Sequence, residues 1–255
     1  MCQLRPGTSP DEAGQRQGHE ANTGAGRSRG PLVGDAALYR NVASTSAADD
    51  LADLAEDVEA SMVIVGTTQE TGLTRALLGS GTERLLHGAT APVTVVAPRW
   101  RQSAPDWISR IGVEYIDTRD AREALRMAVQ VALRIPTRLT LYTVLGQSSE
   151  RYSYLVGKMD EHAFWDVVRD SFRAALDFAA AGVPLELEPR TVLLRGAVVE
   201  SLVALGRNDV DVLVCGSRGC GPVRRVLLGG VSSPLIRRAR LPVTVVPRAI
   251  TAFAE

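Results

Sequence analysis

The stretch LVCGSRGCGPVRRVLLGGVSSPLIRRARLPVTVV, residues Leu213–Val246, decides the fold of this chain. An apolar run enters a glycine-rich loop, and a short helical stretch then leads into a second apolar run, PVTVV. The same pattern stands at Val63–Val96, which reads VIVGTTQETGLTRALLGSGTERLLHGATAPVTVV. The two stretches align without a gap at an offset of 150 residues, so that Gly66 matches Gly216. The chain therefore contains an internal repeat, and one structural unit is expected twice.

Each repeat is preceded by a stretch with helical character. These stretches read AADDLADLAEDVEAS, which begins at Ala47, and AVVESLVALGRNDVD, which begins at Ala197. The repeated unit is therefore predicted as helix, strand, glycine loop, helix and strand. The strands are rich in β-branched residues and lack polar alternation, which is typical of strands covered on both faces in a parallel sheet.

Further strands and helices are predicted ahead of the second repeat. They are a strand at 110–117, a helix at 120–135 capped by Asp120, a strand at 138–145, a loop at 146–158, a helix at 160–182 and a strand within 184–196. Strands that alternate with helices predict an α/β fold with a doubly wound parallel sheet. We expect this complete domain to span residues 107–248.

The first repeat has less sequence ahead of it. Only 61 residues precede Met62, which leaves no room for the opening strand, first helix and second strand of a complete domain. We therefore expect residues 31–100 to form a partial domain, either a remnant or the product of a truncated gene model, in which residues 30–42 add one strand. Residues 1–30 are polar and lack hydrophobic periodicity, so we expect them to be disordered.

Composition and charge exclude several classes of protein. The 29 basic and 29 acidic residues give a formal net charge of +0, which disfavours general binding to nucleic acid or to anionic membranes. No apolar run approaches the roughly 20 residues that span a bilayer, and no secretion signal is recognised. Three cysteines are too few for a disulfide scaffold, so we expect a cytoplasmic protein. No catalytic triad, metal set or pair of acid–base carboxylates is found in the sequence.

The glycines of the second repeat have two interpretations. In an open parallel sheet, ligands bind beyond the carboxyl ends of the strands, where the strand order reverses. The glycine loop after Val212 lies at that edge, and a loop without side chains lets backbone N–H groups approach a phosphate. The alternative is that these glycines only form turns with positive φ. The GxxxxGK[ST] and GxGxxG patterns of other nucleotide-binding loops are not found in the places that they require.

The chain resembles the universal stress protein family in a tandem arrangement. The family's nucleotide pattern is G-x2-G-x9-G-[S/T], and Gly216, Gly219 and Gly229 match it with the right spacing. Gly230 stands where Ser or Thr is usual, and in the first repeat Gln69 stands where the second glycine should be. The resemblance implies a Rossmann-like sheet with the strand order 3-2-1-4-5. It also implies binding of ATP or AMP, with or without Mg²⁺.

The resemblance further implies a set of site residues in the second repeat. Asp117 would face the ribose and phosphates, and Val144 would offer its backbone to adenine. Cys215 and Gly216 would line the adenine and ribose side. Backbone N–H groups for phosphate would come from Gly219, Gly229, Gly230 and Val231, and Ser232 could add its hydroxyl.

Alternatives remain open for several of these side chains. Asp117 could cap the following helix, but Asp120 is better placed as the cap, so we expect Asp117 to be free for a ligand. The arginines near the expected phosphate position are favoured as solvated charges rather than ligands; they are Arg218, Arg224 and Arg225.

The last strand of each repeat suggests how the repeats associate. In the family this strand commonly pairs with its counterpart, across a dimer or a tandem pair. We therefore expect Val93–Val96 to pair with Val243–Val246 within one chain, because such pairing satisfies the unpaired backbone groups of both edge strands. A homodimer of the chain is an alternative that the sequence also allows. Two functions are carried forward. One is a nucleotide-binding regulatory protein of the stress response with at most slow ATP hydrolysis, and the other is an interaction protein that dimerises through its sheet edge without nucleotide.

Overall fold

The structure is a computed structural model, and part of the chain is described. The described residues are 24–26, 37–39, 46–67, 80–97, 100, 105–146, 161–217 and 230–247. Both glycine loops, 68–79 and 218–229, lie outside them. The predictions for Gly219 and Gly229, and for the arginines of the second loop, therefore concern residues that the structure does not describe.

Seven strands form the main sheet. In chain order they are β3 (Val63–Gly66), β4 (Val93–Val96), β5 (Arg110–Glu114), β6 (Arg138–Leu145), β7 (Arg190–Arg195), β8 (Val212–Gly216) and β9 (Val243–Val246). Their order across the sheet is β3-β4-β9-β8-β5-β6-β7, and all neighbours are parallel except β4 and β9. When β5 is counted as the first strand, the strands from β7 to β9 follow the expected order 3-2-1-4-5. The predicted doubly wound α/β fold is confirmed.

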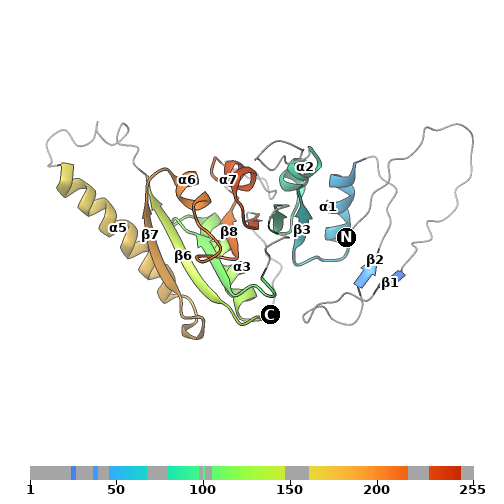
Figure 1. Cartoon of the computed structure of the whole chain (residues 1–255), viewed down its shortest axis with the longest axis horizontal. Helices are drawn as coiled ribbons and strands as arrows, with labels where there is room; N and C mark the ends of the chain where they lie inside the picture. Colours follow the sequence, from blue (N-terminus) through green and yellow to red (C-terminus); the bar gives the residue numbers. More distant parts are fainter. Residues whose placement is uncertain are drawn as a thin grey trace, which may run out of the picture.

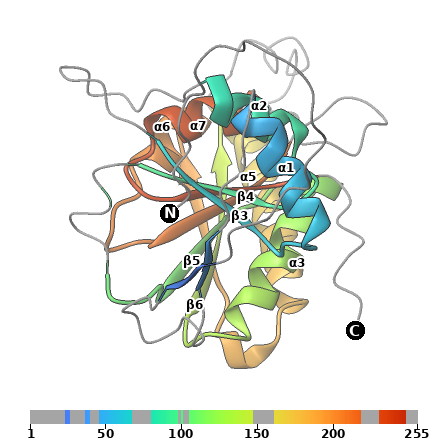
Figure 2. The ribbon, with the colours of Figure 1, turned by 90° about the vertical axis from the view of Figure 1, so that its right-hand side faces the viewer.

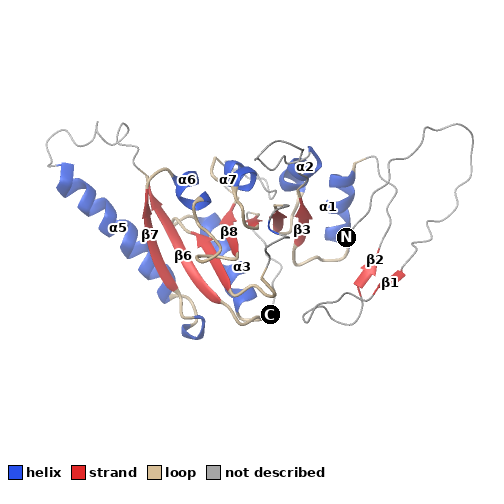
Figure 3. Cartoon of the chain, in the orientation of Figure 1, coloured by secondary structure: helices blue, strands red, loops and turns tan. Residues whose placement is uncertain are grey.

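Helices cover the two faces of this sheet (Figure 2). On one face lie α6 (Val198–Val203), α7 (Ser232–Arg238), α2 (Ser80–Gly88) and α1 (Ala47–Asp57), in a row from left to right in Figure 1. On the other face lie α3 (Arg119–Ala132) and α5 (Glu161–Ala181), and a 3₁₀ turn at Leu185–Leu187 follows α5. Strands and helices alternate through the second repeat in Figure 3, as its sequence predicts.

The two repeats meet edge to edge at the middle of the sheet. Strand β4 pairs antiparallel with β9, with Thr94 opposite Thr244, so the structure pairs the two PVTVV strands. Both repeats share one register, because Val63 pairs with Val93 as Leu213 pairs with Val243. Thr94 and Thr244 are themselves equivalent in the repeat, so an approximate two-fold axis passes between them.

The junction is held by more than backbone pairing. The hydroxyls of Thr94 and Thr244 are 2.8 Å apart and buried, and either one can donate. Arg237 of α7 forms an ion pair with Glu83 of α2. Side chains of both repeats also belong to a single buried cluster under α1, α2, α6 and α7, for example Leu86. The first repeat is therefore packed against the second through a common core.

The segment ahead of α1 contributes little to this sheet. Strand β2 (Ala37–Tyr39) lies within the stretch expected to add a strand to the first repeat, but it pairs with β1 (Gly24–Gly26) in a separate antiparallel sheet. Strand β1 falls within residues 1–30, which the sequence predicted as disordered, and the other residues of that segment lie outside the described ones. None of the helices in the described part of the chain combines the length and apolar character that crossing a bilayer takes.

Candidate functional site

The carboxyl ends of β5, β6 and β8 bring together the described part of the predicted site. Strand β5 lies between β6 and β8, and the chain proceeds from β5 to one side and later returns to the other. This makes the carboxyl edge between β5 and β8 the point where strand order reverses, which is where open α/β sheets bind ligands. Asp117 follows β5, Val144 stands near the end of β6, and Cys215 and Gly216 end β8.

Asp117 is held by its neighbours rather than left free. Arg122 donates from Nε to Asp117 Oδ1 at 2.9 Å, and the Tyr115 hydroxyl donates to the same oxygen at 3.3 Å. The hydrogen bond from Arg122 holds the pKa of the Asp117 carboxyl below its ordinary value. The carboxylate is exposed, so a ligand can reach it, but a ribose hydroxyl must share it with Arg122.

The cap of α3 differs from the prediction. The helix begins at Arg119, and Thr118 is its N-cap, with its hydroxyl accepting from Ala121 N at 3.3 Å. Asp120, predicted as the cap, lies inside the first turn and is buried. Because the helix begins one residue before the predicted start, the side chain at 118 is the one that can reach the third backbone N–H of the helix.

Gly216 has a packing role that neither sequence interpretation included. A Cβ placed on it would lie 2.7 Å from the backbone carbon and oxygen of Asp120. Among the described glycines, positive φ is found at Gly196 and not at Gly216, so a turn does not explain it. The glycine lets the first turn of α3 pass directly over the end of β8, which is close helix–strand packing of the kind that nucleotide-binding folds use.

Val144 and Cys215 offer a ligand their backbone rather than their side chains. Both side chains are buried. Their strands continue the ladder at these positions, with Val144 opposite Leu194 and Cys215 opposite Val245. The adenine role that the resemblance implies for them is therefore limited to edge contacts at the end of the sheet.

The residues that lead into α7 are divided between surface and core. Gly230 is exposed in a turn, and no atom of the described residues lies within 4 Å of a Cβ built there. Val231 is the N-cap position of α7 and makes no side-chain cap bond. Ser232 is buried within the first turn, with its side chain turned into the protein.

Ser217 is a polar residue of this edge that the sequence prediction did not select. Its side chain is 1% exposed, and its Oγ has no hydrogen-bond partner among the described residues. Its backbone N–H donates to Val246 O at 2.9 Å, which fixes the residue at the end of β8. A buried hydroxyl without a hydrogen-bond partner lowers the stability of the fold unless a ligand or a water molecule forms a hydrogen bond with it. The only sequence signal was its place directly after Gly216 in GSRG.

A metal site is not formed by the described residues. No group of three or more His, Cys, Asp or Glu side chains among them is placed to hold an ion. Among the described residues, the site offers the ends of the strands, the exposed Asp117 carboxylate and the buried hydroxyls of Ser217 and Ser232, which are groups that can bind a polar ligand.

Comparison with known proteins identifies the family. The family model described as "Universal stress protein family" matches residues 8–97 and 108–247, which together make up most of the chain. The chain belongs to the universal stress protein family. A universal stress protein of Mycobacterium tuberculosis is 28% identical over 212 residues, which cover 82% of this chain and 72% of that protein.

Solved universal stress proteins share the fold. A putative universal stress protein from Pseudomonas aeruginosa aligns with a TM-score of 0.61 at 14% identity and covers 82% of this chain and 72% of that chain. A universal stress protein solved in complex with cAMP aligns with a TM-score of 0.41 at 24% identity and covers 56% of this chain and 99% of that chain. At these identities the likeness concerns the fold, and the ligand of this chain has to be argued from its own residues.

Proposed function

We propose that this universal stress protein is a regulatory module of the stress response that binds ATP or AMP at the carboxyl edge of its second repeat. The observation that carries the proposal is the buried Ser217 hydroxyl, which has no hydrogen-bond partner among the described residues and lies beside Gly216, where the strand order reverses. The motif match of this repeat to the family's nucleotide pattern supports the same edge.

Each part of the nucleotide is assigned to particular residues of the site. Asp117 accepts hydrogen bonds from the ribose hydroxyls, and its hydrogen bond with Arg122 weakens when the ribose binds. The ends of β6 and β8, at Val144 and Cys215, contact adenine and ribose through their backbone. Gly219, Gly229, Gly230 and Val231, with the Ser232 hydroxyl, are assigned to the phosphates on the family resemblance. Mg²⁺ would accompany the phosphates and has no protein ligand assigned.

We also propose how the chain is divided. Residues 31–100 form a partial unit, and residues 107–248 form the complete nucleotide-binding unit. The β4–β9 contact, the Thr94–Thr244 hydroxyl pair and the Glu83–Arg237 ion pair support stable association of the two units within one chain. With β4 on β9, a homodimer has to use another surface.

Titration calorimetry with ATP and AMP on the full chain tests the nucleotide proposal. We expect saturable binding, and we expect Ser217→Ala to weaken it about tenfold, which corresponds to about 1.4 kcal/mol. The same substitution should leave the free energy of unfolding without nucleotide equal or higher, because it removes a buried hydroxyl that has no hydrogen-bond partner in the described part of the chain. Ser46→Ala, at the start of α1, is the matched control and should bind as the parent chain does.

The Gly219→Val variant tests the phosphate loop separately. It should abolish binding without unfolding the domain, because a side chain there blocks the approach of backbone N–H groups to phosphate. If neither heat nor a thermal shift is found at millimolar ATP or AMP, the chain is instead the nucleotide-independent interaction protein. The observation that favours that second function is the outer edge of β3, with which no described strand pairs.

A further inference from the structure

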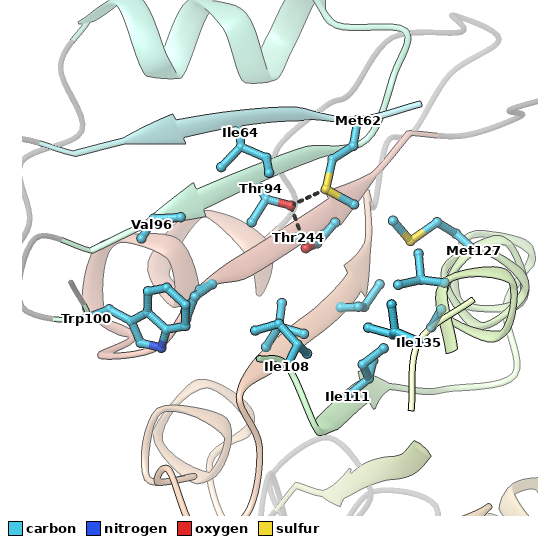
Figure 4. Close-up of a pocket in the computed structure, with 15 residues that line it drawn as sticks. Met62, Ile64, Thr94, Val96, Trp100, Ile108, Ile111, Met127, Ile135 and Thr244 are labelled. Carbon is cyan, nitrogen blue, oxygen red and sulfur yellow. Dashed lines mark hydrogen bonds between the residues drawn. The ribbon is translucent and has the colours of Figure 1, made fainter. Parts of the chain in front are cut away.

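An apolar groove lies on the face of the sheet that carries α3. It has a volume of about 300 Å³ and runs between the β3–β4 edge and α3. Figure 4 shows Met62, Ile64 and Val96 on one side of it, and Met127 of α3 with Ile135 from the turn after α3 on the other, with Trp100 at one end. Ile64 on β3 is 66% exposed although it is a large apolar side chain. None of the residues assigned to the nucleotide lines this groove.

The two-fold relation of the repeats shows what is different about this side. In the second repeat, α3 packs on this face against β8 and β9. Rotation about the two-fold axis would place a copy of α3 over β3 and β4. Among the described residues, no helix stands at that equivalent place, and the buried cluster on this face is formed around α3 and α5 of the second repeat. The groove therefore coincides with the position that the symmetry assigns to a second α3.

The outer edge of β3 is also unpaired among the described residues. Strand β8 has β5 on its outer side, with Ile111 opposite Val212 and Val113 opposite Val214. Strand β3 ends the sheet, and no described strand pairs with its outer side. Val63 and Thr67 donate to carbonyls of the β4 side, so the alternation of the strand turns the N–H groups of Ile64 and Gly66 outward. An exposed row of such groups is a template for another strand.

Gly66 preserves the space that an incoming helix needs. At the equivalent Gly216, a Cβ would lie 2.7 Å from Asp120 in the first turn of α3. At Gly66, no atom of the described residues lies within 4 Å of such a Cβ. The first repeat thus has the same glycine for close helix packing, and the helix that packs there is not among the described elements.

We propose that this open side of the first repeat is a docking surface for a strand–helix segment with the chemistry of residues 110–132 of this chain. The segment adds a strand parallel to β3 and continues into an amphipathic helix that passes over Gly66 and fills the groove with its apolar stripe. Its chemistry is that of residues 110–132 of this chain, where α3 turns its buried alanines and Met127 toward the sheet. This is strand addition combined with a helix in a groove.

No element of the described residues supplies this segment. The sequence ahead of α1 has no amphipathic helical pattern like that of α3, and its described strands β1 and β2 pair with each other. A second copy of the chain keeps its own β5 between β8 and β6, so it cannot donate that strand without opening its sheet. The proposal is independent of nucleotide, because the two surfaces share no residue.

A synthetic peptide with the sequence of residues 108–135 is the probe. The full chain carries Trp107→Phe and Trp165→Phe, so that Trp100 at the end of the groove is its only tryptophan, and the peptide contains none. We expect a saturable blue shift of the Trp100 emission and a one-to-one complex in sedimentation. We also expect slower hydrogen exchange at the amides of Ile64 and Gly66. A scrambled peptide of the same composition should do none of this.

Two variants and a matched control test the placement. Gly66→Val should leave the thermal midpoint unchanged or higher, because the space there is empty, but it should lower peptide affinity at least about tenfold by blocking the helix. Ile64→Asp should have a similar effect on affinity, because it puts a charge into the groove. Phe178→Asp changes an exposed apolar residue of α5 and should bind the peptide as the parent chain does.

A gain-of-function variant tests the register. Asp211 accepts from the backbone N–H groups of Ser109 and Arg110 at 2.9 Å each and so clamps β5, whereas the equivalent position of the first repeat is Ser61. Ser61→Asp should therefore tighten peptide binding several-fold. Unchanged affinity in that variant would overturn the symmetric placement.

Three other results would overturn the proposal. One is the absence of a fluorescence or sedimentation change at high peptide concentration. Another is a dimer of the chain that Ile64→Asp dissociates, which assigns the groove to a second copy. The third is peptide binding that requires prior removal of residues 1–45, which assigns the groove to the chain's own amino-terminal segment.

Discussion

At the scale of single residues, two equivalent glycines have acquired different surroundings. Gly216 lies under the first turn of α3, where a Cβ would collide with backbone atoms that cannot turn away, whereas no atom of the described residues lies within 4 Å of a Cβ at Gly66. The residue type and its place at the end of a strand are the same in both repeats, so the difference comes from the neighbouring element. The effect of a substitution on stability therefore depends on packing and not on backbone conformation, since neither glycine has positive φ.

The two glycines predict opposite effects of one substitution. Gly216→Ala should lower the free energy of unfolding by about 1–3 kcal/mol, because α3 must shift to admit the methyl group. Gly66→Ala should be neutral or raise it by up to about 1 kcal/mol, because alanine loses less backbone entropy on folding than glycine. Urea unfolding of both variants beside the parent chain measures the difference. Equal losses in the two variants would contradict the packing argument.

At the scale of elements, Asp211 fastens the amino end of β8 to that of β5. Its buried Oδ2 accepts from the N–H and Oγ of Ser109 and from the N–H of Arg110, each at 2.9 Å. Its Oδ1 accepts from the Arg110 guanidinium at 3.0 Å. Burial raises the pKa of Asp211, but the hydrogen bonds from Arg110 and Ser109 outweigh it, and the pKa lies below its ordinary value.

Asp211→Asn should loosen this junction and change the response to acid. The variant loses the carboxylate and places an amide N–H₂ among donors, which we expect to cost about 2 kcal/mol or more of stability near neutral pH. Because the pKa in the folded state is below the unfolded value of about 4, the contribution of Asp211 is present above that pH and is lost as pH falls through the folded pKa. Urea unfolding between acidic and neutral pH should therefore show a steeper acid loss in the parent chain than in the variant. Parallel pH profiles would be inconsistent with this role.

At the scale of the whole molecule, the two repeats form one sheet around an approximate two-fold axis. The axis passes between Thr94 and Thr244, which are the only pair of the β4–β9 register that is equivalent in the repeat. The hydroxyl of Thr94 donates to the sulfur of Met62 at 3.0 Å, and in that arrangement the hydroxyl of Thr244 is the donor of the pair on the axis. The junction thus joins a polar contact on the axis to the apolar core that both repeats share.

A double-mutant cycle should detect the contact on the axis. Thr94→Val and Thr244→Val should each cost about 1 kcal/mol of stability, because each leaves the opposite buried hydroxyl with a poorer partner. The double variant should cost less than the sum, since two methyl groups of the same shape leave no orphaned hydroxyl there. Chemical unfolding of the four chains gives the coupling free energy. Strict additivity would show that the hydroxyl pair contributes nothing to the junction.

Parts of this fold could be read from sequence because they depend on neighbours along the chain. The gapless repeat, the β-branched runs and the alternation of strands with helices predicted the units, and the structure has strands at the predicted places. The cap of α3 was missed by a small margin. Thr118 and Asp120 are both cap-forming residues, and which one caps depends on where the first turn begins, which the sequence alone leaves open by a residue or two.

By itself, the sequence determined that one helix–strand–loop–helix–strand unit occurs twice and that its strands belong to a doubly wound sheet. Only the tertiary structure decided that Asp117 is held by Arg122 and that Gly216 lies under α3. It also decided that Ser217 is buried with no hydrogen-bond partner among the described residues, and that an apolar groove lies beside the first repeat. Each of these depends on what packs beside a residue once distant elements meet. Periodicity and motif spacing carry no information about such neighbours, because they record only the order of residues along one strand or helix.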